Sequence, residues 1–383
     1  MMFLVAVTAF FIVLFSMPTL IKVAREKGLI DLPENPRKIH KRAVPAMGGV
    51  VIFAALLINV FFWLALGPTP PTEMFQAGCA LASCTVVIFM MGLKDDIIGM
   101  APSKKLLVHL VVGIILISVG DFKINTFGGL FGLEALPESL SLVFSLFVYI
   151  VVVNALNLID GVDGLAAGYT VIAMSAFAFW FLNTGQTPIA IIALTLAGAM
   201  GGFLVFNVAP AKVFLGDSGS LLAGLLAYSL ATYVINTPDN LVPISWIGIS
   251  KPVIAMSILA YPLVDTLRVF CLRAARGISP FSPDCNHLHH RLMMVTLSHA
   301  KTSVFVYIFS FSILAISWAR PLLFPKLNEE GMFFGLFTLS FLWFLPVLIR
   351  TKGQHNLARK RDELLKDAIE QNKKHKASES AVA

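Results

Sequence analysis

The chain has 383 residues, of which 57% are hydrophobic and 13% charged, and its mean hydropathy is +0.82. Soluble domains carry about 25% charged residues, so this composition excludes an ordinary soluble protein and indicates a polytopic membrane protein. The formal net charge of +7 needs no nucleic acid to explain it. Basic loops that face anionic lipid account for such a charge.

Continuous apolar runs recur along the chain, each close to the roughly 20 residues that a helix needs to cross a bilayer core. A transmembrane β-barrel would show short alternating strands instead. The expected fold class is therefore all-α, an integral membrane bundle of about eleven transmembrane helices. In chain order the runs lie near residues 2–21, 47–66, 75–93, 106–120, 139–157, 164–182, 188–207, 219–236, 253–267, 302–318 and 332–349.

Basic residues predict the orientation of the bundle. Lys22, Arg25 and Lys27 follow the first run, which lacks the features of a cleaved signal peptide. The positive-inside rule then puts the N-terminus in the periplasm and the C-terminus in the cytoplasm. Threading the runs alternately leaves only four basic residues outside, namely Lys123, Lys251, Arg320 and Lys326.

The chain divides into a transmembrane domain, residues 1–350, and a charged cytoplasmic tail, residues 351–383. The tail is expected to be a solvated segment that faces the lipid surface. The four cysteines show no CxxC or zinc spacing, so free thiols are expected.

Five unusual polar stretches fall on the predicted cytoplasmic loops, and none falls outside. They are "HKRAVPAMGG" (40–49), "GLKDDIIGM" (92–100), "NALNLIDGVDG" (154–164), "NVAPAKVFLGDSGS" (207–220) and "SPFSPDCNHLHHRL" (279–292).

Two of these stretches are rich in carboxylates. Asp95 and Asp96 are adjacent at the end of a run. Alone, the pair could be an interfacial end-cap, but neighbouring carboxylates repel and are best stabilised by a divalent cation or a cationic clamp. Asn157, Asp160 and Asp163 are spaced to share one helical face, although the glycines at 161 and 164 predict a break there.

Oxygen ligands of this kind suit Mg²⁺, which binds one or two carboxylates and keeps the rest of its shell for water and substrate phosphates. "GDSGS" places Asp217 between two glycines, in a turn whose backbone N–H groups could approach a phosphate. The sequence Gly-Asp-Ser-Gly within it also fits an ordinary turn.

"HLHH" brings His287, His289 and His290 together with Arg291. Zinc is one reading, but no cysteine lies at a matching spacing. A clamp for a pyrophosphate, with the imidazoles as donors, fits the carboxylates better.

Basic and aromatic residues extend this picture. Lys41 and Arg42, and Lys104 with Lys105, could widen the basic rim, although topology explains them equally well. Phe214 could stack on a base, or be an ordinary aromatic at the end of a span.

Together these stretches indicate a Mg²⁺-dependent site for a phosphorylated substrate where the cytoplasm meets the bilayer. The usual signatures of ATP-driven transport, serine hydrolysis and dinucleotide chemistry are missing from the sequence.

The five motifs, in this order, resemble those of the polyprenyl-phosphate N-acetylhexosamine-1-phosphate transferases. The resemblance runs from "PAMGG" to "HLHHRL". "SPFSPDCNHLHH" resembles most the bacterial branch that moves N-acetylglucosamine-1-phosphate from UDP-GlcNAc to undecaprenyl phosphate and so begins O antigen or enterobacterial common antigen.

The resemblance implies roles for the acidic and amide residues. Asp95 and Asp96 match a pair implicated in metal binding and in deprotonating the lipid phosphate. Asn157, Asp160 and Asp163 match a motif at the nucleotide and the catalytic centre. The implied catalytic residues are Asp95, Asp96, Asp160 and Asp163, and the implied metal ligands are Asp217, Asp95 and Asn157. Mg²⁺ is the implied cofactor, with Mn²⁺ as a substitute.

The resemblance also implies a set of substrate contacts. Asn207 and Phe214 match positions on the uridine side, and the histidine loop matches one that faces the pyrophosphate and sugar. The implied substrate-binding residues are Lys41, Asn157, Asn207, Phe214, His287, His289, His290 and Arg291. Two positions depart from the family pattern. Members often have Arg where Cys285 stands before the histidines, and many have Arg or Tyr where Ile97 follows the paired aspartates.

The implied setting is the bacterial inner membrane, with the active site on the cytoplasmic face. The implied partners are UDP-GlcNAc, undecaprenyl phosphate and membrane lipid, without nucleic acid, and a homodimer stays open. Direct attack and a covalent two-step route also stay open. Two rival functions remain, the same reaction on another UDP-N-acetyl sugar and a cation-coupled transporter, whose carboxylates would lie nearer the bilayer midplane.

Overall fold

The computed structural model describes residues 2–30, 44–67, 71–246, 248–277 and 286–349. Within these ranges the protein is helical and has no β-strand, apart from one isolated bridge between Thr126 and Ala135. The predicted tail and Lys41, Arg42 and Cys285 lie outside the described residues.

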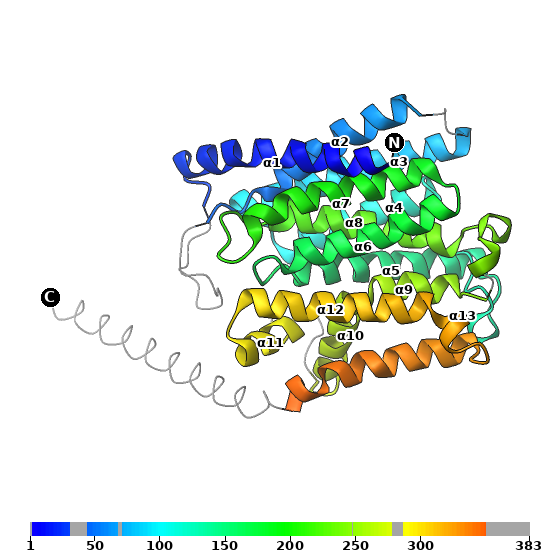
Figure 1. Ribbon diagram of the computed structural model, residues 1–383. Helices are drawn as coiled ribbons and strands as arrows, with labels where there is room; N and C mark the ends of the chain where they lie inside the picture. Colours follow the sequence, from blue (N-terminus) through cyan, green and yellow to red (C-terminus); the bar gives the residue numbers. More distant parts are fainter. Residues whose placement is uncertain (1, 31–43, 68–70, 247, 278–285, 350–383) are drawn as a thin grey trace.

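The long helices run side by side as a bundle (Figure 1). They are α1 (Met2–Glu26), α2 (Gly48–Ala65), α3 (Thr72–Ile98), α4 (Pro102–Ser118), α5 (Glu138–Leu158), α6 (Leu165–Asn183), α7 (Thr187–Asn207), α8 (Gly216–Ile235), α12 (His299–Trp318) and an unlabelled last helix, Glu329–Ile349. Between α8 and α12, α9 (Lys251–Ile258) and α10 (Ala260–Ala274) form a bent pair. The short helices are η1 (Leu130–Gly132), η2 (Asp239–Leu241), η3 (Ile244–Trp246), α11 (Leu288–Thr296) and α13 (Arg320–Leu323).

The all-α membrane fold is confirmed. Nine helices of the described chain are long and apolar enough to cross a membrane, and the bent pair α9 and α10 makes up to ten. The 17-residue α4 coincides with a further predicted run. Every predicted run therefore coincides with a helix or with this bent pair, while the number of crossings and the orientation stay predictions.

The run at 253–267 is predicted as one straight span but is broken, with α9 and α10 meeting at 80°. Pro262 explains the break, because proline has no N–H to donate to the carbonyl of Ile258. The hydroxyl of Tyr169 donates to that carbonyl instead, at 2.7 Å. Figure 1 shows α10 lying across the long helices, and this places its buried polar residues beside α11.

Helix α8 lies at the centre of the bundle. It contacts α2, α3, α5, α6 and α9, and 94% of its most apolar window is buried. A helix that is apolar on all sides is expected in such a position. The helix is largely buried from Ser218 onward, whereas Gly216 and Asp217 at its start are half-buried.

Glycine permits the closest helix contact at the edge of the bundle, between α1 and α7. A Cβ on Gly198 would lie 2.1 Å from the carbonyl oxygen of Ala6. The α1 backbone therefore passes directly over this residue, as small residues allow in membrane helix packing.

Replacement of Gly198 by alanine tests this contact. The added methyl must push α1 away, and such overpacking costs about 1 to 3 kcal/mol. Gly198→Ala is expected to lower the melting temperature of the protein in detergent by several degrees. The matched control is Gly78→Ala on α3, where no atom lies within 4 Å of the added Cβ. Equal melting temperatures for the two variants would contradict the close packing.

Candidate active site

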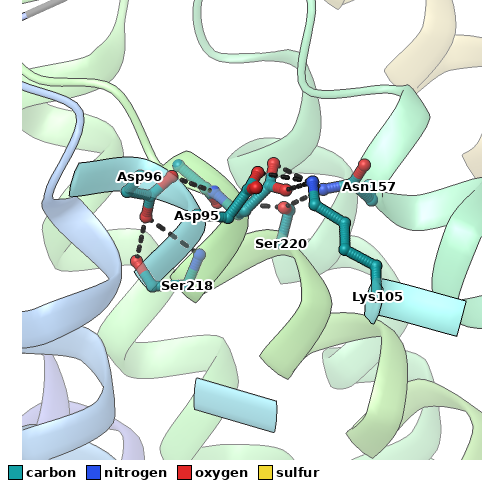
Figure 2. A network of polar contacts seen from close by, with 8 residues as sticks. Asp95, Asp96, Lys105, Asn157, Ser218 and Ser220 are labelled. Atoms are coloured by element: carbon teal, nitrogen blue, oxygen red, sulfur yellow. Dashed lines mark hydrogen bonds and ion pairs between the residues drawn. The ribbon is translucent and has the colours of Figure 1, made fainter. Parts of the chain in front are cut away.

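The first turn of α8 is held by carboxylates from other segments. The backbone N–H groups of Asp217 and Ser218 donate to the two oxygens of Asp96, at 2.7 and 3.0 Å. The Ser218 hydroxyl donates to the same carboxylate at 2.7 Å. Asp96, at the end of α3, therefore caps a helix that begins 120 residues later, as Figure 2 shows.

Asp160 completes this cap. It accepts a hydrogen bond from the backbone N–H of Gly216 and lies near Asp217 and Asp96. Burial, and then the charges of these two carboxylates, raise the pKa of Asp160 well above its usual value. The surroundings of Asp160 therefore favour its protonated form.

Gly216 is required by both conformation and space. Its φ is +76°, and a Cβ there would lie 2.6 Å from an Asp96 oxygen and 2.8 Å from the Ala46 carbonyl. A glycine at position 216 therefore lets the backbone pack directly against Asp96. The backbone amides that the sequence offered to a phosphate donate to aspartates instead, so any phosphate contact has to come from other groups.

Asp217 lies where several helices meet. The Asn157 side-chain amide, in the last turn of α5, donates to one Asp217 oxygen at 3.0 Å and to the Ser220 hydroxyl at 2.9 Å. The Lys105 ammonium, from α4, donates to the other Asp217 oxygen at 2.8 Å and also to Asp95. Figure 2 shows Lys105 reaching into this cluster. The structure thus brings together Asp95, Asp96, Asn157, Asp160 and Asp217, as the sequence predicted.

The donor set fits a hard divalent cation. The Lys105 ammonium forms ion pairs with both Asp95 and Asp217, so the two carboxylates are arranged to share one positive charge. Carboxylate oxygens with an amide alongside are ligands that Mg²⁺ accepts. No cluster of three His, Cys, Asp or Glu side chains within the described ranges is arranged around a common point for a metal ion. Asp95, Asp217 and Asn157 would therefore leave most of the coordination shell to water and substrate.

Asp163 lies at the edge of this group and binds neighbouring segments. Its carboxylate accepts a hydrogen bond from the backbone N–H of Ala211, and its own N–H donates to Nδ1 of His299, both at 3.0 Å. The Ser303 hydroxyl donates to its carbonyl at 3.0 Å. The predicted break after α5 is confirmed, since α5 ends at Leu158 and α6 begins at Leu165.

Asn207 is buried, with 3% of its surface exposed. Its side-chain oxygen accepts from the backbone N–H of Gly164, and its amide donates to the carbonyl of Val213, both at 2.9 Å. The Asn207 side chain therefore connects the loop between α5 and α6 to the loop between α7 and α8. The predicted contact with uridine is not tested by this placement and stays a prediction.

The histidine motif forms the neighbouring wall. His287 and His289 are buried and their rings stack in parallel, 5.6 Å apart, with His290 4.2 Å from His289. A Cβ on Gly161 would lie 2.8 Å from Nε2 of His289. Burial, and then the neighbouring His290, lower the pKa of His289 to about 3, so its ring is neutral at physiological pH.

Arg291 and Phe214 are tied to the surrounding framework. The Arg291 guanidinium donates twice to the side-chain oxygen of Asn286, at 2.9 and 2.7 Å, and it is 8% exposed. Phe214 is half-buried, and its backbone pairs with Pro45 and Gly48, at 2.8 and 2.9 Å. The described parts of the five polar stretches thus meet at one end of the bundle.

Two residues of the site, Asp265 and His299, escaped the sequence prediction, and the role of a third, Lys105, was left open. Lys105 was explained equally well by topology, and only its contact with Asp217 gives it a role. Asp265 on α10 accepts hydrogen bonds from the histidine loop, and His299 contacts Asp163. The single signal available was a carboxylate inside an apolar run, at Asp265.

Comparison with known proteins agrees with this geometry. The family model for glycosyl transferase family 4 matches residues 79–235. The chain is 34% identical to the probable undecaprenyl-phosphate N-acetylglucosaminyl 1-phosphate transferase of Bacillus subtilis, over 79% of this chain and 81% of the relative.

The chain belongs to the polyprenyl-phosphate N-acetylhexosamine-1-phosphate transferases. It is also 29% identical to the undecaprenyl-phosphate alpha-N-acetylglucosaminyl 1-phosphate transferase of Yersinia pestis, over 87% of this chain and 88% of that one. The decaprenyl-phosphate N-acetylglucosaminephosphotransferase of Mycobacterium tuberculosis is 29% identical, over 91% and 89%. The resemblance to the polyprenyl-phosphate N-acetylhexosamine-1-phosphate transferases is confirmed.

Lys105 is expected to be essential for sugar-phosphate transfer, because it balances the charges of Asp95 and Asp217. Lys105→Gln should lower the turnover number by about 100-fold, the scale of removing one preorganised electrostatic contact. The adjacent Lys104 is exposed and serves as the matched control. Transfer assays on Lys105→Gln and Lys104→Gln check this, and similar activities would show that the bridge has no function.

Gly161→Ala tests the contact between the aspartate loop and the histidines. The added methyl would meet the buried His289 ring at 2.8 Å, so the ring or the loop has to move. We expect transfer activity to fall at least about tenfold, because displacement by a fraction of an ångström is costly at a catalytic centre. Gly335→Ala, with open space around the new Cβ, is the control. Full activity in Gly161→Ala would contradict the contact.

Proposed function

We propose that the protein transfers N-acetylglucosamine-1-phosphate from UDP-GlcNAc to undecaprenyl phosphate and releases UMP. The product is the lipid-pyrophosphate-linked first sugar of a cell-surface polysaccharide. One observation carries the proposal. Asp217 is held together with Asp95, Asn157 and Lys105 at the end of the bundle, where a soluble donor can meet an acceptor that stays in lipid. The printed names of the relatives supply the polyprenyl phosphate and the N-acetylglucosamine.

In this reaction an oxygen of the lipid phosphate attacks the phosphorus that carries the sugar. A new P–O bond forms, the bond to the bridging oxygen breaks, and UMP leaves with that oxygen. Phosphoryl transfer of this kind depends on alignment and on neutralising charge. Asp95 and Asp217 would hold Mg²⁺, which offsets the negative charge of the pyrophosphate. Lys105 lies where it can contact a transferred phosphoryl group.

An apolar cavity supports a long hydrocarbon acceptor. Its volume is about 200 Å³, and it lies between α5, α8 and the bend of α9 and α10, with Phe144, Phe147 and Leu259 in its wall. Phe147 is 60% exposed, so the cavity lies close to the surface of the bundle. Val152, in the same wall, is five residues before Asn157 on α5, about 7.5 Å along the helix.

We place the site on the cytoplasmic face of the bacterial inner membrane. The basic loops next to the described motifs favour that side by the positive-inside rule. The nucleotide donor is also made in the cytoplasm. The competing form of the proposal is the same transfer with another UDP-N-acetyl sugar, and the closing experiment separates the two.

The experiment is UMP release by the purified full-length protein in detergent, with undecaprenyl phosphate, Mg²⁺ and one UDP-N-acetyl sugar at a time. UDP-GlcNAc is expected to give the highest kcat/KM, EDTA to abolish release, and added Mg²⁺ to restore it. Asp217→Asn should lose at least about 100-fold in rate.

Asp239→Asn is the matched control, because Asp239 is exposed and pairs with Lys251 away from the site. Its rate should equal that of the unmodified protein. A higher kcat/KM with another UDP-N-acetyl sugar would overturn the choice of GlcNAc alone. Absence of UMP release with every sugar, from folded protein, would overturn the reaction.

A further inference from the structure

Asp265 is a buried carboxylate that the proposed chemistry does not use. It lies on α10, in the second half of the broken span, and 1% of its surface is exposed. One oxygen accepts the backbone N–H of Leu288 at 2.8 Å, and the other lies 3.0 Å from Nδ1 of His287. Both oxygens therefore face the start of the histidine helix α11.

The hydrogen bond from the Leu288 N–H to Asp265 caps α11, which has no cap from its own N-terminal residues. His287 is the N-cap residue of α11, and its own side chain makes no capping hydrogen bond. Asp265 takes over that function from another helix and fixes the first turn of α11. Its charge also suits the positive end of the helix dipole.

The surrounding charges favour an ionised carboxylate. The guanidinium of Arg268 lies 3.6 Å from Asp265 and also donates to the carbonyl of Asn286, the residue before the histidines. Asp265 thus has a cation on one side and two donors from α11 on the other. An ionised carboxylate can only accept hydrogen bonds, so the proton between Asp265 and His287 belongs to Nδ1 of the histidine.

We propose that Asp265 is a positioning residue of this site, which fixes Nδ1 of His287 as the protonated nitrogen and leaves Nε2 to meet the substrate. The catalytic part of this statement rests on the proposed function. The orientation of the ring does not, because it follows from the contacts alone. A hydrogen bond at one ring nitrogen of a histidine determines what the other can do.

The effect extends beyond His287. Its ring stacks in parallel on that of His289, and Nε2 of His289 contacts Gly161 in the aspartate loop. A shift of His287 therefore reaches the turn that carries Asp160 through two direct contacts. Through these contacts Asp265 links α10, the second half of the broken span, to the turn that carries Asp160.

Asp265→Asn is the decisive substitution, because it keeps the size of the side chain and replaces an acceptor oxygen by an N–H donor group. The Leu288 N–H needs the remaining oxygen, so the NH₂ group faces His287 and requires an acceptor at Nδ1. The proton then moves to Nε2. The full-length protein contains eight histidines. Nitrogen-15 spectra of histidine-labelled protein in detergent distinguish the two neutral tautomers and the doubly protonated ring, and His287→Gln identifies the signals of His287.

We expect a protonated Nδ1 at His287 in the unmodified protein and an unprotonated Nδ1 in Asp265→Asn. Ser257→Ala is the matched control, since Ser257 is a buried polar residue of the same broken span that bonds Ser317 at 2.6 Å and does not contact the histidines. Its His287 signals should not change. A bare Nδ1 in the unmodified protein, or an unchanged His287 in Asp265→Asn, would overturn the proposal.

Kinetics separate positioning from a general loss of structure. Asp265→Asn should lower kcat for UMP release roughly 10- to 100-fold, as removal of an orienting partner does, with KM for the nucleotide sugar changed less than about twofold. Asp265→Glu, which restores the acceptor, should recover part of kcat. A rise in KM with unchanged kcat would contradict the assignment.

The spectra decide the ring orientation even if no UMP is released by the unmodified protein. In that case the transferase proposal fails by itself, and the positioning of His287 by Asp265 is judged by the tautomer alone. The two proposals therefore stand or fall on different measurements.

Discussion

The start of α8 is a helix N-terminus inside a membrane bundle, and the arrangement of the site follows from how its N–H groups are satisfied. The first N–H groups of a helix have no partner within the helix and need acceptors from elsewhere. The carboxylates of Asp96 and Asp160 accept these hydrogen bonds and also oppose the positive end of the helix dipole. Since they come from α3 and from the turn after α5, the cap fixes three segments relative to one another. Asp217, in that same first turn, is thereby directed toward Asn157 and Lys105.

Capping a buried helix with two carboxylates creates an electrostatic problem, because Asp95 and Asp217 bring two further acidic groups to the same place. Like charges in surroundings of low polarity raise the free energy of the folded state unless cations or protons compensate them. Lys105 supplies one positive charge, and Asp160 responds through its raised pKa. Excess negative charge of this kind is what the proposed Mg²⁺ would offset. The folding requirement and the proposed chemistry therefore use the same residues.

The helices could be predicted from the sequence much better than the contacts between the side chains of the site. Hydropathy is local, so the helical runs were predicted well, and alternation of the runs brought the five polar stretches to one end. The break between α9 and α10 was missed, because only Pro262 signals it and the hydroxyl that satisfies Ile258 comes from Tyr169, on another helix. The role of Lys105 was left open because its partner Asp217 lies 112 residues later. Pairings over such distances depend on helix packing, which a single sequence does not display.

Long-range capping also explains why particular residues occupy the polar loops. Asp265 holds α11 as Asp96 holds α8, so these two helix N-termini are each closed by a carboxylate from another helix. The two capped helices approach each other across the aspartate turn, where His289 contacts Gly161. A side chain at that position would separate the carboxylate cluster from the histidines. The glycines of the third motif therefore do two different things. Gly164, with φ of +80°, turns the backbone, whereas Gly161 leaves the space through which the two halves of the site meet.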